Sequence, residues 1–256
     1  MLDLAAVSHV VLSPHLDDAA LSVGGLIARR TAAGESILVV TIAAGSPPAH
    51  AILSPFAASF HRAWGLDATD AVAHRRREDE AALAILGAGG MRLEWLDAVY
   101  RRPELYDTEA ALFGEPAADD RLQIELSAAL APILAASPRA LVLAPLAVGG
   151  HVDHRIVHRA AVEIAAQGRE VAFYEDLPYA TMPDAVAQRR AALGFDTGPV
   201  TFDITGALDR KIAAILAYSS QIGSLFGDGE QARSAITAYA LSVGEDAPAE
   251  RIWRPR

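Results

Sequence analysis

The segment from Val7 to Ala44, VSHVVLSPHLDDAALSVGGLIARRTAAGESILVVTIAA, decides the fold. Val7 to Leu12 is a short β-branched run bounded by Ser13-Pro14, which predicts a buried strand. Ser36 to Ala44 predicts a second strand, buried on both faces, because its apolar residues do not alternate with polar ones. The stretch from Asp17 to Arg30 predicts a helix that opens with acidic residues and is interrupted at Gly24-Gly25. A strand, a helix and a second buried strand together form the repeating unit of a parallel sheet.

The same alternation continues along the chain. Further strands are predicted at 91–96, 140–144 and 171–174, and further helices at 75–86, 122–136, 154–167 and 208–218. Pro132 predicts a kink or break in its helix, and the segment from Tyr100 to Asp120, rich in Pro, Gly and Asp, is predicted to be a loop. We therefore expect one α/β domain over residues 1–256, with a Rossmann-like, doubly wound, mostly parallel sheet and helices on both faces.

The composition argues against several classes of partner. The chain has 22 Lys and Arg against 32 Asp and Glu, a formal net charge of −10, which does not suit binding to nucleic acid or anionic lipid. No apolar run reaches the roughly 18–20 residues of a membrane span, so we expect no membrane span and a cytoplasmic protein. The apolar share of 52% is compatible with a homo-oligomer. Since the chain has no Cys, any metal must be held by His, Asp or Glu.

The first polar cluster is Ser13-Pro14-His15-Leu16-Asp17-Asp18, between the first strand and its helix. This is the carboxyl end of a strand, where open α/β sheets bind their ligands. Asp17 and Asp18 taken alone are better explained as helix caps, because a pair of Asp residues in a loop is common. His15, two residues before the carboxylates, adds an imidazole within the same turn, which favours a metal site.

The second polar cluster is Gly149-Gly150-His151-Val152-Asp153-His154, between the strand at 140–144 and the next helix. His151 and His154 are three residues apart, so their side chains can point to one side of a helix start. His158, one turn further on, is interpreted as a solvated helix residue. Because both clusters follow strands at the same edge of the sheet, we expect them to meet in space.

Two imidazoles and one carboxylate leave a tetrahedral zinc with one open position, which is typical of catalytic zinc sites. Such a site polarises a carbonyl and activates water, as hydrolysis of an amide requires. A spare carboxylate can take the proton of the water, and a His-Asp pair can stabilise the oxyanion or protonate the departing amine. The same ligands would also accept iron or cobalt.

At these two clusters the chain resembles the PIG-L/LmbE-like zinc-dependent N-deacetylases. The segment from Ser13 to Asp18 is similar to their AHPDD-type signature, and Gly150 to His154 is similar to their HxDH-type signature. Ser13 stands in place of the usual Ala, and Leu16 in place of the usual Pro, which loosens the turn. Weaker similarities are found at 75–87, 96–97, 174–179 and 203–221.

The resemblance implies a role for each residue of the clusters. His15, Asp18 and His154 would bind one zinc ion per chain, and Asp17 would be the general base. His151 would steady or protonate the tetrahedral intermediate, oriented by Asp153. The implied reaction removes the N-acetyl group of an N-acetylglucosamine-type sugar conjugate, such as a small glycoside or a natural-product intermediate.

Two further residues are implied to bind substrate, each with a competing interpretation. Asp97 would accept a hydrogen bond from a sugar hydroxyl, but an Asp after a strand is often a turn residue. Arg75 would contact a polar or anionic part of the substrate, but the run 75–77 also suits a solvated helix face paired with acidic neighbours. Arg101 and Arg102, in the predicted loop, are expected on the surface that shapes the substrate pockets.

The sequence disfavours two other classes of function and leaves two open. A nucleotide-binding protein is disfavoured because no glycine-rich loop follows the first strand, and a serine hydrolase is disfavoured because no GxSxG occurs. An amidase that cleaves a larger amide of a sugar or thiol conjugate stays open. So does a non-catalytic carbohydrate-binding module, although such a module would be expected to lose one of the six His and Asp residues.

Overall fold

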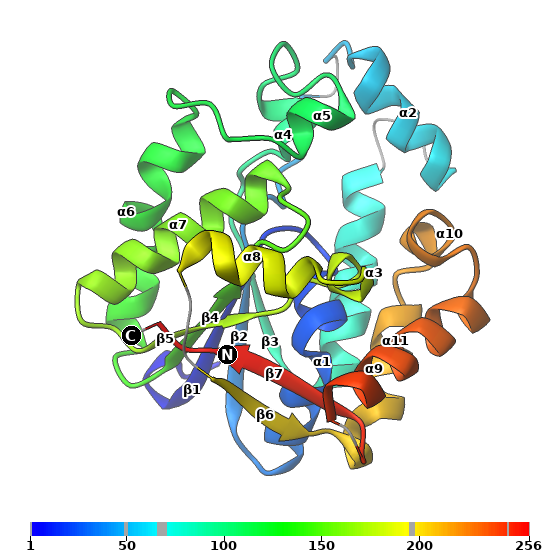
Figure 1. Ribbon diagram of the computed structural model, residues 1–256. Coiled ribbons are helices and arrows are strands. Elements are labelled where there is room, and N and C mark those ends of the chain that lie inside the picture. The colour runs from blue at the N-terminus through cyan, green and yellow to red at the C-terminus, as the bar shows by residue number, and fades with distance from the viewer. Residues whose placement is uncertain (1, 49–50, 66–70, 195–197, 245, 256) are drawn as a thin grey trace.

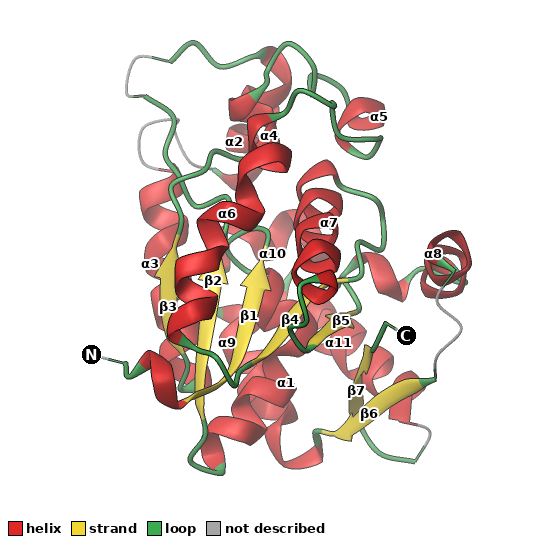
Figure 2. Cartoon of the chain, turned by 90° about the vertical axis from the view of Figure 1, so that its left-hand side faces the viewer, coloured by secondary structure: helices red, strands yellow, loops and turns green. Residues whose placement is uncertain are grey.

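The computed structural model describes residues 2–48, 51–65, 71–194, 198–244 and 246–255. In these residues, seven strands form one sheet in the order β3-β2-β1-β4-β5-β7-β6. The strands are β1 (Val7–Ser13), β2 (Ser36–Thr41), β3 (Gly89–Arg92), β4 (Leu141–Pro145), β5 (Val171–Tyr174), β6 (Pro199–Asp203) and β7 (Ala249–Trp253). Figures 1 and 2 show helices on both sides of this sheet.

Strands β1 to β5 pair in parallel, and β7 runs antiparallel to both β5 and β6. The strand order reverses direction between β1 and β4, which lie side by side with Val10 opposite Val142. The loops that leave the carboxyl ends of these two strands therefore start next to each other. This is the switch point at which doubly wound sheets bind their ligands.

The helices divide between the two faces of the sheet. Figure 2 shows α6 and α7 on one face and α1 and α9 on the other, while α2, α4 and α5 gather beyond the carboxyl ends of the strands. The longer helices are α1 (Asp18–Ala32), α2 (Pro55–Trp64), α3 (Ala71–Leu86), α6 (Arg121–Ala136), α7 (Val152–Ala166), α8 (Ala185–Leu193), α9 (Leu208–Leu216), α10 (Ser219–Phe226) and α11 (Gly229–Gly244). The short ones are η1 (Leu4–Ala6), α4 (Ala98–Arg101), α5 (Glu109–Leu112), η2 (Tyr179–Thr181) and η3 (Thr205–Ala207).

Helix α1 is interrupted in its second turn, immediately before the Gly24-Gly25 pair that predicted an interruption. Val23 leaves the helical conformation, with φ −129° and ψ 20°, and the buried Glu250 of β7 bonds the backbone amides of Gly25 and Leu26 at 2.9 and 2.7 Å. Lys211 of α9 is also buried and donates to the same carboxylate at 2.7 Å. This ion pair ties the helix that begins at the first His-Asp cluster to β7 and α9.

The structure confirms the predicted fold class and four of the five predicted strands within a few residues. Strand β3 is shifted, since it begins at Gly89 and ends at Arg92. After it, Leu93 still bonds Thr41, but Glu94 forms an antiparallel bridge to Ala43, so the chain has left the parallel ladder.

Other expectations on secondary structure were wrong or incomplete. Pro132 lies inside an unbroken α6, and the predicted loop from Tyr100 to Asp120 contains the end of α4 and all of α5. Helices α2, α8, α10 and α11 and the strands β6 and β7 were not predicted. In the part of the chain that is described, no helix is both long and apolar enough to span a membrane.

Candidate active site

The first His-Asp cluster forms a tight turn between β1 and α1. Ser13 Oγ donates to the carbonyl of His15 at 2.7 Å and accepts the amide of Ala19 at 3.0 Å. Asp17 has a φ of 116°, a backbone conformation that is strained for a residue with a side chain. Arg75 donates to the carbonyl of Leu16 at 2.8 Å. These bonds hold the turn in place although Leu16 replaces a proline.

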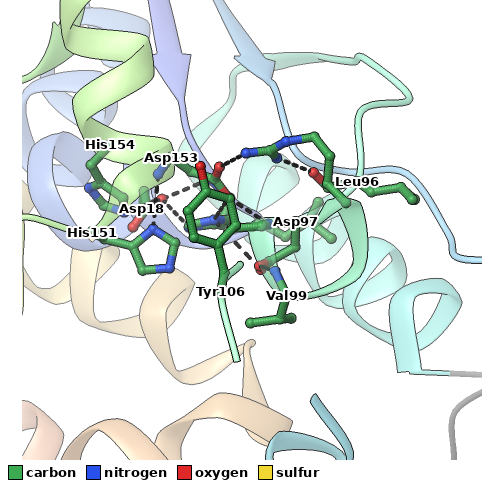
Figure 3. Close-up of polar contacts among 12 residues, drawn as sticks. Asp18, Leu96, Asp97, Val99, Tyr106, His151, Asp153 and His154 are labelled. Carbon is green, nitrogen blue, oxygen red and sulfur yellow. Dashed lines mark hydrogen bonds and ion pairs between the residues drawn. The ribbon is translucent and has the colours of Figure 1, made fainter. Parts of the chain in front are cut away.

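Asp18, the last residue of the first cluster, contacts a histidine of each cluster. Its Oδ2 atom is 3.3 Å from Nδ1 of His15 and 3.3 Å from Nε2 of His154 (Figure 3). Tetrahedral zinc holds nitrogen and oxygen ligands at roughly 2.0–2.2 Å, which places neighbouring donor atoms about 3.3–3.5 Å apart. Ring nitrogens of His15, His151 and His154 also lie within 4.8 Å of one another. The donor set and its spacing therefore fit a small divalent metal ion.

The second cluster begins at two glycines with φ of +83° each. A side chain at Gly149 would clash, because its Cβ would lie 2.5 Å from the ring of Tyr179. His151 follows and caps α7, its Nδ1 accepting the backbone amide of Asp153 at 3.2 Å. A neutral ring that accepts at Nδ1 carries its proton on Nε2, so His151 can donate a hydrogen bond from that atom.

The carboxylate of Asp153 does not have the partner that the family resemblance implies. It bonds Nε2 of His15 at 3.0 Å, the amide of Ala98 at 3.0 Å and the guanidinium of Arg101 at 2.6 Å. Among the described residues it makes no hydrogen bond to the ring of His151. His151 is therefore oriented by its hydrogen bond with the backbone amide of Asp153, and not by the carboxylate of Asp153 as expected.

Two buried residues of the site were missed from the sequence. Asp176, just after β5, bonds Nδ1 of His154 at 2.7 Å and the amide of Val148 at 2.9 Å. Arg101, expected on the surface of a loop, is the last residue of α4 and has a side chain only 8% exposed. The position of Asp176 at the carboxyl end of the strand beside β4 was the available signal, whereas Arg101 had none.

Arg75 and Asp97 both line the cavity above the clusters. Arg75 Nη2 lies 3.3 Å from Asp17 Oδ2, and its guanidinium is 5.0 Å from the centre of the Trp64 ring. The competing interpretation of Arg75 as part of a solvated face was therefore wrong. Asp97 Oδ2 is 3.6 Å from His15 Nε2, while its other oxygen caps α4 at the amide of Val99.

His158 is also placed differently from its interpretation as a solvated residue. It is buried, its Nδ1 bonds the carbonyl of Pro145 at 2.9 Å and its ring centre is 4.5 Å from that of Phe173. The reason is its spacing of four residues from His154, which puts both rings on the side of α7 that faces the sheet.

The buried charges of the site shift one another's protonation. Burial raises the pKa of Asp17 to about 7, against the opposing effect of Arg75. Burial would lower the pKa of His154, but Asp18 and Asp176 raise it to about 9. Burial and the nearby His15 lower the pKa of His151 well below its usual value. Such a concentration of shifted groups in one cavity is typical of a functional site.

The outer wall of the cavity is largely apolar. It is built by residues of α2, α5, α10 and the segment after β5, namely Phe60, Trp64, Leu112, Phe113, Leu177, Pro178, Tyr179 and Leu225. The polar groups are concentrated at its floor, around the two clusters. This arrangement suits a substrate with a polar reacting group and an apolar or ring-shaped remainder.

A carboxylate between two imidazoles, with a second carboxylate beside it at the switch point of an α/β sheet, is the arrangement of a metal-dependent hydrolase. The chain belongs to the PIG-L family: the family model described as GlcNAc-PI de-N-acetylase matches residues 10–165. This confirms the resemblance found in the two signatures and the prediction of an enzyme that hydrolyses amides.

Individual relatives are deacetylases of sugar-containing compounds. A 2'-N-acetylparomamine deacetylase of Streptomyces fradiae is 36% identical over 224 residues, which cover 83% of this chain and 72% of that protein. The crystal structure of the A40926 pseudoaglycone deacetylase has a TM-score of 0.77 at 30% identity, covering 97% of both chains. The zinc-inhibited form of teicoplanin deacetylase has a TM-score of 0.81 at 27% identity, covering 96% of this chain and 97% of that one.

Proposed function

We propose that this protein is cytoplasmic and removes the N-acetyl group from an N-acetylglucosamine-type sugar conjugate, a small glycoside or natural-product intermediate, using one zinc ion per chain. The observation that carries the proposal is the position of Asp18 Oδ2, 3.3 Å from a ring nitrogen of both His15 and His154. In this proposal these three residues hold the metal. When bound there, zinc would act as a Lewis acid that polarises the amide carbonyl and lowers the pKa of water, so that the water can lose a proton and attack.

The remaining residues supply the proton transfers. Asp17, adjacent to a proposed ligand and held by Arg75 at 3.3 Å, takes the proton of the attacking water and can return it to the departing amine. His151 donates a hydrogen bond from Nε2 to the oxygen that becomes negative in the tetrahedral intermediate. The products balance as one amine and one acetate for each amide and water consumed.

Substrate binding is proposed for two groups at the floor of the cavity. Asp97, which lines the cavity, accepts a hydrogen bond from a hydroxyl of the sugar ring. Arg75, which also lines the cavity, contacts a polar or anionic group of the substrate. The aromatic rings of Trp64 and Phe113 then cover the apolar face of the sugar or its aglycone.

Relatives support both parts of this proposal. The relatives named above are deacetylases of 2'-N-acetylparomamine, A40926 pseudoaglycone and teicoplanin. One related structure is described as a zinc-inhibited form, which is consistent with metal binding in this family. The type of aglycone differs among these relatives, and we propose only the shared unit, the N-acetylated amino sugar.

The proposal is tested by removing metal with a chelator and restoring zinc, followed by measurement of amine and acetate release. The panel contains N-acetylglucosamine conjugates with apolar and polar aglycones, together with the same conjugates carrying longer acyl groups. We expect acetate release only after zinc is restored. Preference for the longer acyl groups would establish the alternative amidase, and binding without turnover by the zinc-loaded protein would establish a carbohydrate-binding module.

A further inference from the structure

Both proposed metal-binding histidines have a buried carboxylate on the ring nitrogen that faces away from Asp18. His154 has Asp176 on Nδ1 at 2.7 Å, and His15 has Asp153 on Nε2 at 3.0 Å. Asp176 and Asp153 are at most 1% exposed. A carboxylate at one ring nitrogen holds the proton there and leaves the lone pair of the other nitrogen for a metal.

Asp153 is itself fixed by Arg101. The guanidinium bonds Oδ1 of Asp153 at 2.6 Å, Asp120 at 2.9 Å and the carbonyl of Leu96 at 2.6 Å. Because Arg101 bonds groups on three different segments, its side chain is held in one orientation. Asp153 Oδ2 is thereby left to bond His15 and the amide of Ala98.

We propose that Arg101 and Asp176 are positioning residues of the metal site. Arg101 acts through Asp153 to hold His15 with Nδ1 toward Asp18, and Asp176 holds His154 with Nε2 toward the same oxygen. This inference rests on the proposed function, because it assumes that these histidines bind a metal. In this proposal Asp153 orients the metal ligand His15, and it does not orient His151.

A purely structural role makes a different prediction. Asp176 also bonds the amide of Val148, and Arg101 also bonds Asp120 at the start of α6, so both residues contribute to stability. If stability were their only role, the folded fraction of a variant would bind metal with unchanged affinity. If they position the histidines, the affinity of the folded protein falls by roughly 10- to 100-fold, the usual effect of losing such a partner.

The experiment measures the zinc affinity of metal-free protein by competition with a chromophoric chelator, together with the visible absorption spectrum of the cobalt-loaded protein. The variants are Asp176→Asn, which keeps the shape of the side chain, and Arg101→Met. Arg101→Lys restores one donor and should recover part of the affinity. The matched control is Glu175→Gln, because Glu175 is a buried neighbour of Asp176 that bonds Tyr239, Arg251 and Trp253 and, in the described part of the chain, no histidine.

We expect a roughly 10- to 100-fold weaker zinc affinity and an altered cobalt spectrum for Asp176→Asn and Arg101→Met, with Glu175→Gln like the wild type. Wild-type affinity and spectrum in folded Asp176→Asn would overturn the inference, and this variant decides alone if Arg101→Met does not fold. An equal loss in Glu175→Gln would also overturn it. A wild-type protein that binds neither zinc nor cobalt would instead refute the proposed function.

Discussion

The Oδ2 atom of Asp18 lies 3.3 Å from the Nε2 atom of His154, although the two residues follow different strands. The contact exists because β1 and β4 are neighbours in the sheet and each strand ends in a turn that carries part of the ligand set. The site therefore depends on the topology of the sheet as well as on the two sequence signatures. Its central residue is Asp18, which contacts both histidines.

Asp18→Asn is expected to weaken zinc binding by more than about 100-fold, beyond the usual effect of losing an outer partner of a ligand. The reason is that the variant removes the negative charge between the two imidazoles. Competition with a chelator measures the affinity. Asp209→Asn is the control, because the side chain of Asp209 is 98% exposed. Zinc affinity equal to that of the wild type would exclude Asp18 as a ligand.

Arg75→Met is expected to lower kcat about 10- to 100-fold while zinc stays bound. The variant removes charged hydrogen bonds to Leu16 and Asp17, each worth roughly 1.5–3 kcal/mol, and so releases the strained turn that presents Asp17. Steady-state kinetics and zinc analysis measure the two effects. Arg77→Met, at an exposed position of the same helix, should behave as the wild type. An unchanged kcat in Arg75→Met would show that the turn needs no such support.

Lys211→Met is expected to destabilise the protein by about 3–5 kcal/mol, because it leaves the buried Glu250 without its cation. Urea denaturation measures the free energy of unfolding. The double variant Lys211→Met with Glu250→Gln should be less destabilised than the sum of the two single variants, since it leaves no buried charge. A loss below about 1 kcal/mol in Lys211→Met would contradict the importance of this ion pair.

The stability of the protein is expected to depend on the protonation of His158. Burial lowers the pKa of His158 to about 4 from its ordinary 6.5, so below pH 6.5 the unfolded chain binds a proton that the folded chain does not. The contribution of His158 to the free energy of unfolding is complete above pH 6.5 and falls as the pH drops toward 4. About 2 kcal/mol of it is lost at pH 5.

His158→Asn tests this expectation, because an amide can still donate to the carbonyl of Pro145 without titrating. The free energy of unfolding of both proteins is measured at pH 7.5 and pH 5. The variant should lose about 2 kcal/mol less than the wild type between these two values. Equal losses in both proteins would mean that His158 titrates alike in the folded and unfolded states.

The parts of the fold that could be predicted are those with a local signal. Strands β1 and β4 are short runs rich in apolar residues, and a polar cluster lies between each strand and the next helix, so the meeting of His15, Asp18 and His154 was predictable. Strand β6 could not be predicted, because its residues are mostly exposed and it pairs only with β7 at the far end of the chain. Its pairing depends on contacts remote in sequence.

The wrong predictions at the site also arise from contacts between segments that are remote in sequence. The sequence shows that Asp153 lies two residues from His151, but the carboxylate is directed away by Arg101, which is contributed by another segment. Asp176 is remote in sequence from the histidine that it bonds, so its role was visible only once β5 was placed beside β4. His158 was misjudged because its helix was not oriented relative to the sheet.

The most direct test of the proposed mechanism is the activity of zinc-loaded Asp17→Asn. This variant keeps the size of the side chain and leaves the three proposed ligands unchanged. We predict about one zinc per chain, as in the wild type, and a fall of roughly 10²- to 10⁴-fold in acetate release, the usual contribution of a general base. Acetate release near the wild-type rate with zinc bound would contradict the account.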